Sequence, residues 1–292
     1  MIISASYRTD IPAFYGAWFE KRLGAGFCRV ANPYGGKPSR VSLRDGVDGF
    51  VFWTRNIGPF RPVLAGLELP FVVQYTVTGY PRPLEASVIE AEASVALIRA
   101  VAELHGPRAV VWRYDPILIS DLTPPEWHLV NFAGLAQALE GAVDEVTVSF
   151  VQPYRKTTRN LDLAARRHGF AWRDPEPSEK AAILAQLEVL AAARGMALTL
   201  CTQPDLPGAP ARCIDAARLS DLAGKAIAAK TKGNRPGCLC AESRDIGAYD
   251  SCPHGCVYCY AVAGRELAKR RFHAHDPGGE LLIDLGNPVT AR

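Results

Sequence analysis

The sequence of 292 residues contains no apolar run that approaches the length of a membrane span. Its opening residues, MIISAS, lack the basic start and the long apolar segment of a secretory signal. There is no low-complexity tract and no internal repeat beyond a strand-helix unit. Because 48% of the residues are hydrophobic and 22% are charged, the chain can bury a substantial core in one large or two small domains. We therefore expect a globular protein that stays in the cytoplasm, without a membrane partner.

The sequence also carries little net charge, with a formal value of +3 at pH 7. Proteins that bind nucleic-acid duplexes usually have a concentrated basic face and a higher isoelectric point. The charge therefore gives no indication of nucleic-acid binding, but it leaves a nucleic acid open as a substrate.

Cysteine, by contrast, is present and clustered. There are eight cysteines, most of them after residue 200, which favours metal binding in a reducing compartment over disulfides. Cys252, Cys256 and Cys259 stand in the segment SCPHGCVYCYA and are separated by three and then two residues. Three thiolates can hold a four-iron cluster and leave one iron without a protein ligand, where a small molecule can bind and receive an electron.

The residues between these cysteines suit a loop that wraps around a cluster. Pro253 and Gly255 prevent a regular helix. A structural zinc site is an alternative, with His254 or another cysteine as the fourth ligand, but the second cysteine pair of a zinc knuckle is absent. An electron-transfer ferredoxin is a further alternative, although its run of four cysteines is not seen.

The other cysteines form a second candidate metal site. This group consists of Cys201, Cys213, Cys238 and Cys240. A closed auxiliary 4Fe-4S cluster requires four cysteine ligands, which is the number present here. Alternatively, Cys201 is an ordinary buried thiol and only some of the others bind a metal such as zinc. Cys28 alternates with its neighbours in a predicted strand and is expected in the core.

Short apolar runs rich in β-formers alternate with helical patterns. We predict strands at 1–5, 26–31, 49–53, 71–76, 109–113, 145–150 and 197–201, and helices at 12–23, 85–105, 124–139 and 178–194. The last helix is expected to begin at a Ser178 cap. Repeated strand-helix-strand units favour an α/β fold with parallel strands and right-handed crossovers.

Polar and aromatic residues follow most of these strands. The carboxyl ends of the strands of a parallel barrel converge on one mouth, where such residues collect, whereas in an open doubly wound sheet they would spread along an edge. We therefore predict a parallel (β/α) barrel, partial or permuted TIM-like, over residues 1–201. Residues 202–292, rich in Pro, Gly and Cys, are expected to form a cysteine-rich metal-binding segment, with helices at 215–230 and 260–271, that packs on the barrel mouth.

The segment from Cys252 to Tyr260 resembles the cluster motif of radical S-adenosylmethionine (SAM) enzymes, including the aromatic residue before the last cysteine. The resemblance implies that Cys252, Cys256 and Cys259 hold a 4Fe-4S cluster, that its open iron chelates the amino and carboxylate groups of SAM, and that Tyr258 lies near the adenine. Most radical SAM enzymes carry the motif after the first barrel strand. Here it follows residue 250, so the order looks permuted.

Almost the whole chain resembles a narrower bacterial family, the domain of unknown function DUF1848, which has no assigned reaction. The resembling stretches are 8–13, 32–33, 51–56, 75–80, 111–117, 149–150 and 243–249. The family also shows cysteines at the places of the four-cysteine group, which supports the auxiliary site.

Five strand-end residues are candidates for catalysis. Arg8 follows the first buried strand, where an arginine suits a carboxylate or phosphate. Asp10 is a proton-transfer group or merely a helix cap, and Arg113 and Asp115 act in the chemistry or simply pair with each other. Tyr154 is the fifth candidate.

Three residues besides Tyr258 are candidates for binding SAM or an anionic substrate. They are Asn56, an amide at a strand end, and Lys232 and Arg235, two cations that precede Cys238 and Cys240.

The sequence thus predicts a radical SAM enzyme that cleaves SAM reductively and acts on an unknown substrate, served by an electron donor such as flavodoxin or ferredoxin. One alternative is repair or modification of nucleic acid by the same chemistry, as in proteins similar to spore photoproduct lyase; it requires a concentrated basic groove beside the cluster. The other is a non-catalytic iron-sulfur or zinc protein.

Overall fold

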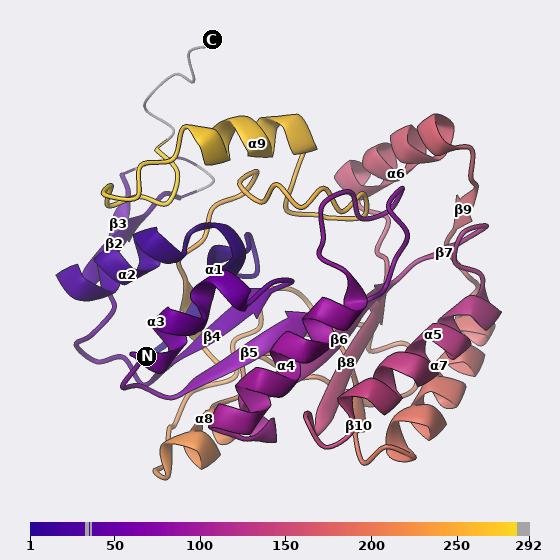
Figure 1. Cartoon of the computed structure of the whole chain (residues 1–292), viewed down its shortest axis with the longest axis horizontal. Coiled ribbons are helices and arrows are strands. Elements are labelled where there is room, and N and C mark those ends of the chain that lie inside the picture. Colours follow the sequence, from indigo (N-terminus) through magenta and orange to yellow (C-terminus); the bar gives the residue numbers. More distant parts are fainter. Residues whose placement is uncertain (33–34, 36, 285–292) are drawn as a thin grey trace.

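The computed structural model of the protein describes residues 1–32, 35 and 37–284. Its centre is one sheet of eight strands in which every neighbouring pair is parallel (Figure 1). This confirms the prediction of an α/β fold with a parallel sheet. The strands, in spatial order, are β11 (Ala209–Pro210), β10 (Ala197–Leu200), β8 (Glu145–Phe150), β6 (Val110–Ile117), β5 (Phe71–Thr76), β4 (Gly49–Thr54), β1 (Ile2–Ala5) and β12 (Ser243–Asp245).

The strand order follows the chain from β1 to β11 without a reversal, and β12 is added on the free side of β1. Among the described residues no strand pairing joins β11 to β12. The segments after β11 and before β12 do meet, because the Ala241 amide donates to the Ile214 carbonyl at 2.8 Å. The established architecture is therefore an eight-stranded parallel sheet, and the cysteine-rich segment supplies the strand at each end of it.

Helices cover one face of this sheet. In Figure 1, α4, α5 and α7 lie side by side along it, and their apolar residues pack against strand residues such as Val73 and Trp112. The helices are α1 (Ile11–Phe14), α2 (Gly16–Ala25), α3 (Arg61–Ala65), α4 (Ala91–His105), α5 (Pro125–Leu139), α6 (Arg155–His168), α7 (Pro177–Ala192), α8 (Ala216–Ala223) and α9 (Arg265–His273), with short 3-10 helices η1 (Gly58–Phe60) and η2 (Pro107–Ala109).

The other face of the sheet changes character along the strands. Near the amino ends it is apolar, and Ile2, Val51 and Val72 pack against α8 and the flanking segment through residues such as Leu219. Toward the carboxyl ends, the strand register places Gln74 and Arg113 on the same face. The cysteine-rich segment thus buries the apolar half of this face, while the polar half stays available for a site.

Several predicted elements differ in the structure. The predicted strand at 26–31 is β2 (Phe27–Val30), which pairs with β3 (Ser39–Ser42) in a separate antiparallel hairpin, so it was wrongly included among the parallel strands. The helix predicted at 12–23 is divided at Tyr15, and α7 starts from Glu176 without the expected serine cap. The remaining two-stranded pair, β7 (Ile119–Ser120) with β9 (Trp172–Arg173), was not predicted.

The segment before α4 also departs from the predicted helix at 85–105, because α4 begins only at Ala91. The last predicted helix, at 260–271, begins only at Arg265. The predicted metal-binding segment is described as far as residue 284, and its residues 285–292 lie outside the described part.

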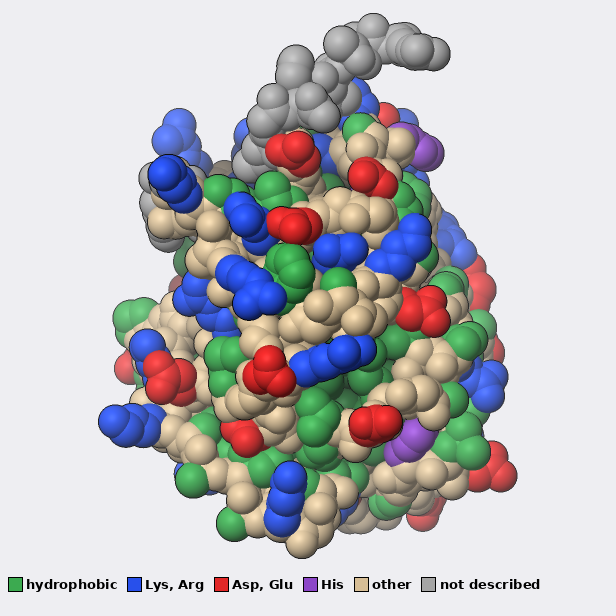
Figure 2. All heavy atoms as spheres, turned by 90° about the vertical axis from the view of Figure 1, so that its left-hand side faces the viewer, with side chains coloured by type: hydrophobic (Ala, Val, Ile, Leu, Met, Phe, Trp, Pro, Cys, Tyr) green, Lys and Arg blue, Asp and Glu red, His purple; other side chains and the backbone are tan. Residues whose placement is uncertain are grey.

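Within the described ranges, no helix is both long and apolar enough to span a membrane. Figure 2 shows the face that carries α2 and the hairpin, where basic and acidic side chains are intermixed.

Candidate functional site

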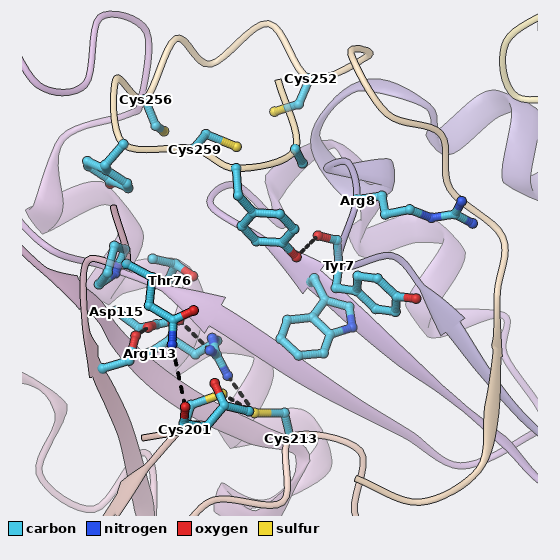
Figure 3. A pocket seen from close by; sticks show the side chains of 18 of the residues that line it. Tyr7, Arg8, Thr76, Arg113, Asp115, Cys201, Cys213, Cys252, Cys256 and Cys259 are labelled. Atoms are coloured by element: carbon cyan, nitrogen blue, oxygen red, sulfur yellow. Dashed lines mark hydrogen bonds and ion pairs between the residues drawn. The ribbon is translucent and has the colours of Figure 1, made fainter. Parts of the chain in front are cut away.

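A cavity of about 570 Å³ opens at the carboxyl ends of the sheet strands. Seven of the eight cysteines line it, the exception being Cys28, which is buried in the core. Figure 3 shows Cys252, Cys256 and Cys259 together on one side of the cavity, and Cys201 and Cys213 on the opposite side near Arg113 and Asp115. The structure therefore brings the two predicted cysteine groups to one space.

The three-cysteine loop, residues 251–261, is fixed to the segment that precedes α4. Cys256 forms an antiparallel bridge with Glu85, and the Val257 amide donates to the Leu84 carbonyl at 3.1 Å. The Ser87 amide donates to the His254 carbonyl at 2.9 Å. Segment 84–87, which was predicted as helix from residue 85 onward, is instead a backbone edge that holds the loop over the cavity.

His254 lines the cavity, and its ring is held by protein groups on both sides. Its Nε2 lies 2.8 Å from Oδ2 of Asp10, and its Nδ1 lies 3.4 Å from the Ser87 carbonyl. Both ring nitrogens therefore have protein partners, which disfavours His254 as the fourth ligand of a zinc ion. Asp10 also caps α1, since its Oδ1 accepts from the Ala13 amide at 2.9 Å, so the interpretation of Asp10 as a helix cap is confirmed.

Tyr258 is held in a buried charged cluster. Its hydroxyl donates to Glu85 and accepts from Nη2 of Arg55 at 2.5 Å. Arg55 and Glu85 form an ion pair of 2.7 Å, with side chains only 10% and 3% exposed. Thr78 donates a further hydrogen bond of 2.6 Å to Glu85. The aromatic residue of the motif thus has a fixed position on the cavity wall.

Burial favours the protonated form of the loop thiols. Burial raises the pKa of Cys256 to about 12, against the opposing effect of Arg55. Burial likewise raises the pKa of Cys252 well above its ordinary value, and nearby Asp10 adds to the effect. A metal that binds these sulfurs must displace their protons, so binding is coupled to proton release.

The four-cysteine group is a continuous chain of sulfurs. Sγ of Cys213 lies 3.6 Å from Sγ of Cys201, and Cys240 forms hydrogen bonds with both Cys213 and Cys238. The bond to Cys240 lowers the pKa of Cys238 to about 6. Nη1 of Arg113 donates to Cys213 at 3.0 Å, which places a cation directly beside the group.

Arg113 and Asp115 pair with each other, which is the simpler of their two predicted roles. Although burial opposes the charge of Arg113, Asp115 and the thiols of Cys213 and Cys201 keep its pKa well above the ordinary value. Ser149 donates to the second oxygen of Asp115. Both carboxylate oxygens therefore have partners while the group still lines the cavity.

Arg8 pairs with a carboxylate of the protein itself. Its Nε lies 2.7 Å from Oδ1 of Asp245 on β12, and both side chains are almost fully buried. Ser4 and Ser6 donate to the same carboxylate at 3.0 and 2.8 Å. Arg8 lines the cavity, but this pairing, which fastens β12 to β1, is a structural reason for its place.

The remaining predicted site residues divide into two groups. Tyr154 and Arg235 line the cavity and contact each other at 3.2 Å, and Nη2 of Arg235 lies 3.8 Å from Sγ of Cys201. Asn56 and Lys232 do not line it. Asn56 accepts from the Gly58 amide at 3.0 Å, and Lys232 pairs with Glu242 on the surface, so the structure gives their predicted role in cofactor binding no support.

The donor set can be compared with what metals require. Among the residues that the structure describes, no three His, Cys, Asp or Glu side chains are arranged to hold a metal ion. A lone zinc ion needs its donors at about 2.0–2.3 Å from one centre. Three thiols on one side of a cavity, without a fourth donor arranged beside them in the described residues, fit a polynuclear iron-sulfur cluster better than a single ion.

Sequence reasoning missed two residues of this site, Arg55 and Glu85. Arg55 directly follows β4. An arginine after a buried strand was the signal that could have identified it. Glu85 carried no comparable signal, because its position beside the loop depends on a contact between residues 173 positions apart.

Comparison with known protein families gives a match to the family described as Domain of unknown function (DUF1848), over residues 2–261. The match covers most of the chain and includes all seven cavity cysteines, so the chain belongs to this family. Neither the curated proteins nor the solved structures include one that matches the chain.

Proposed function

We propose that this member of the DUF1848 family is a radical SAM enzyme that acts on a substrate bound in the cavity. One observation carries the proposal. Three thiols with the spacing of a radical SAM motif lie along one side of a cavity, and polar strand-end residues occupy the opposite side.

In this proposal Cys252, Cys256 and Cys259 hold a 4Fe-4S cluster. When bound, the cluster supplies an electron that cleaves SAM and yields a deoxyadenosyl radical able to abstract hydrogen from an unactivated carbon. The protein has to orient SAM and exclude water. Tyr258 presents its ring from a position set by Arg55 and Glu85, which suits contact with the adenine.

Residues across the cavity would position the substrate and move protons. Asp115 has carboxylate geometry fixed by Arg113 and Ser149, so it is the proposed proton acceptor. Tyr154 and Arg235 line the same cavity and offer a hydroxyl and a cation to an anionic substrate.

We also propose that the four-cysteine group holds a second 4Fe-4S cluster. The continuous contacts among its sulfurs and the adjacent guanidinium of Arg113 support this, because a cation stabilises thiolates. A zinc ion in the same group is the alternative, and metal analysis distinguishes the two.

The corresponding architecture is an incomplete, permuted (β/α) barrel. It is supported by the strand order without a reversal, by the place of β12 beside β1, and by the hydrogen bond from Ala241 to Ile214 across the opening. In such a barrel the active site lies at the carboxyl ends of the strands, as this cavity does.

The test is anaerobic reconstitution with iron and sulfide, followed by reduction in the presence of SAM. We expect a brown protein that releases deoxyadenosine, and we expect Cys256→Ala to lose this activity together with the iron of the first cluster. Cys28→Ala is the matched control, because Cys28 lies outside the cavity. Colourless protein that carries zinc and releases no deoxyadenosine would refute the proposal and favour a non-catalytic metal protein.

A further inference from the structure

Two basic helices flank the three-cysteine loop. In Figure 1, α6 and α9 lie on the side of the molecule where the loop runs. Together they carry nine Lys and Arg residues against two acidic ones, whereas the formal charge of the whole chain is only +3. We refer to α6, the three-cysteine loop and α9 as the basic platform. It concentrates positive charge beside the proposed cluster.

Both helices are tied to the chain around the loop. Asn160 on α6 donates to the Val262 carbonyl at 3.2 Å, and Arg159 donates to the Ala263 carbonyl. Arg271 on α9 donates to the Tyr249 carbonyl at 2.9 Å and lies 3.6 Å from Asp250. The positive charge therefore has a fixed place relative to the three cysteines.

The charged face of α6 is open to solvent. Arg155, Arg159 and Arg166 are all exposed and share one side of the helix. In the part of the chain that the structure describes, none of the three forms an ion pair with a carboxylate. These charges are available to an external partner.

Apolar groups accompany the charge on this surface. Leu163 on α6 is 53% exposed, and two tyrosines of the adjoining cavity lining, Tyr154 and Tyr260, are 44% and 41% exposed. Exposed aromatic and aliphatic side chains surrounded by charge are typical of protein interfaces.

We propose that the basic platform is the docking surface for a small acidic electron-carrier protein of the flavodoxin type. The inference rests on the proposed function, because the proposed cluster needs an electron from another molecule. The two helices of the platform flank the loop that would hold this cluster. Complementary charge accelerates such encounters without a large interface.

The charge and the exposed side chains favour a protein over a nucleic acid. A nucleic acid presents a continuous track of phosphates, which Asp162 on α6 and Glu266 on α9 would interrupt, whereas the carboxylates of an acidic protein are discrete and can pair with the arginines alone. The apolar side chains, in turn, suit a protein surface that buries them on contact.

The first experiment measures binding of oxidised flavodoxin to the purified protein by calorimetry and does not depend on catalysis. We expect the triple variant Arg155→Glu, Arg166→Glu, Arg167→Glu, which reverses exposed cations of α6 and leaves the bond from Arg159 to Ala263 in place, to lose about tenfold or more in affinity. A matched triple variant reverses exposed cations on α2, α3 and the turn after α8, namely Lys21→Glu, Arg61→Glu and Lys225→Glu, and should bind as the wild type does. Raising salt from about 50 to about 200 mM should weaken wild-type binding more than that of the α6 variant.

The second experiment compares reduced flavodoxin with dithionite as electron source for deoxyadenosine release. We expect the α6 variant to be slow with flavodoxin and normal with dithionite. Equal flavodoxin affinity in all three proteins would overturn the docking surface, and so would tighter binding of a short DNA duplex than of flavodoxin. If dithionite supports no deoxyadenosine release in any of them, the proposed function fails, while the affinities still decide the docking surface separately.

Discussion

Gly255 is the residue on which the shape of the three-cysteine loop depends most directly. Its φ of +79° lies in the left-handed region, and a Cβ at this position would lie 2.6 Å from Cδ of Arg265 and 3.2 Å from the Ala86 side chain. Both the backbone conformation and the close approach therefore require glycine.

We expect Gly255→Ala to lower the free energy of unfolding by about 1–2 kcal/mol from the backbone conformation alone. The contact with Arg265 adds to this cost, and displacement of the loop should reduce iron uptake on reconstitution. Urea unfolding and iron analysis measure the two effects.

Gly264→Ala is the matched control, because a Cβ there meets no atom within 4 Å and the residue has an extended φ of −173°. Equal stability and equal iron content in the two variants would show that the loop tolerates a side chain at Gly255.

For individual residues, the sequence predicted the place in the fold better than the hydrogen-bonding partners. Arg8, Asp10 and Arg113 were expected at strand ends and do line the cavity. The pairing of Arg113 with Asp115 was also predicted, but the other partners, Asp245, His254 and Cys213, come from segments 100 or more positions away, and local patterns contain no information on such contacts.

The elements that hold the loop depend on a buried ion pair. Arg55 at the end of β4 and Glu85 before α4 have few polar neighbours besides Thr78 and Tyr258. Removing one partner of a buried pair leaves the other charge uncompensated.

We expect Glu85→Gln to lower the free energy of unfolding by about 3 kcal/mol, because Arg55 remains charged and buried. Loss of the carboxylate also releases Tyr258, so SAM should bind more weakly to the reconstituted protein. Denaturant unfolding and equilibrium dialysis with SAM provide the measurements.

Glu242→Gln serves as the control for this pair. Glu242 contacts Lys232 at 2.8 Å on the surface, where water screens the interaction, so its loss should leave stability unchanged. A Glu85→Gln protein as stable as Glu242→Gln would contradict the role assigned to the buried pair.

The helices richest in apolar residues were predicted from the sequence, whereas the highly charged helix α6 was not. Helices α4, α5 and α7 bury one side against the sheet, and their sequences are apolar over most of their length. Helix α6 buries only Thr157, Leu161 and Ala164 among many charged residues, so its pattern was not recognised. Strand β12 contains only the polar residues Ser243, Arg244 and Asp245, which resemble a loop.

The stability of the whole molecule should depend on pH through His128 on α5. Its Nε2 donates to the Leu118 carbonyl at 3.0 Å, so its Nδ1 accepts from the Tyr114 hydroxyl at 2.8 Å. Burial of this neutral ring lowers the pKa of His128 from 6.5 to about 4. Above pH 6.5 the ring is neutral in both states; as pH falls toward 4, the unfolded chain binds a proton that the folded protein does not, and stability is lost.

Between about pH 7.5 and about pH 5, we expect His128 to contribute about 2 kcal/mol to the loss of unfolding free energy. His128→Gln should lose correspondingly less over the same interval, whatever its stability at neutral pH. His273→Gln, at an exposed position, should keep the wild-type dependence. Identical pH profiles for the wild type and His128→Gln, measured by urea unfolding, would contradict this assignment.

For the molecule as a whole, the sequence predicted the parallel sheet and the meeting of the cysteines with the strand ends. It did not predict that the cysteine-rich segment contributes β11 and β12, because strands of two and three residues fall below any periodicity. The sequence also did not indicate that this segment packs on the apolar half of one face of the sheet. Ile214 and Leu219 can be recognised as core residues only once the position of the sheet is known.

The place of β12 has a consequence for how the protein is made. Among the strands that the structure describes, β1 is synthesised before all the others and its neighbour β12 after all the others, and the hydrogen bond from Ser4 to Asp245 joins residues 241 positions apart. Until β12 has been synthesised, one edge of β1 stays unpaired and open to association with other chains. The three-cysteine loop follows β12 directly, so the proposed cluster would form on it only after the described strands have been made.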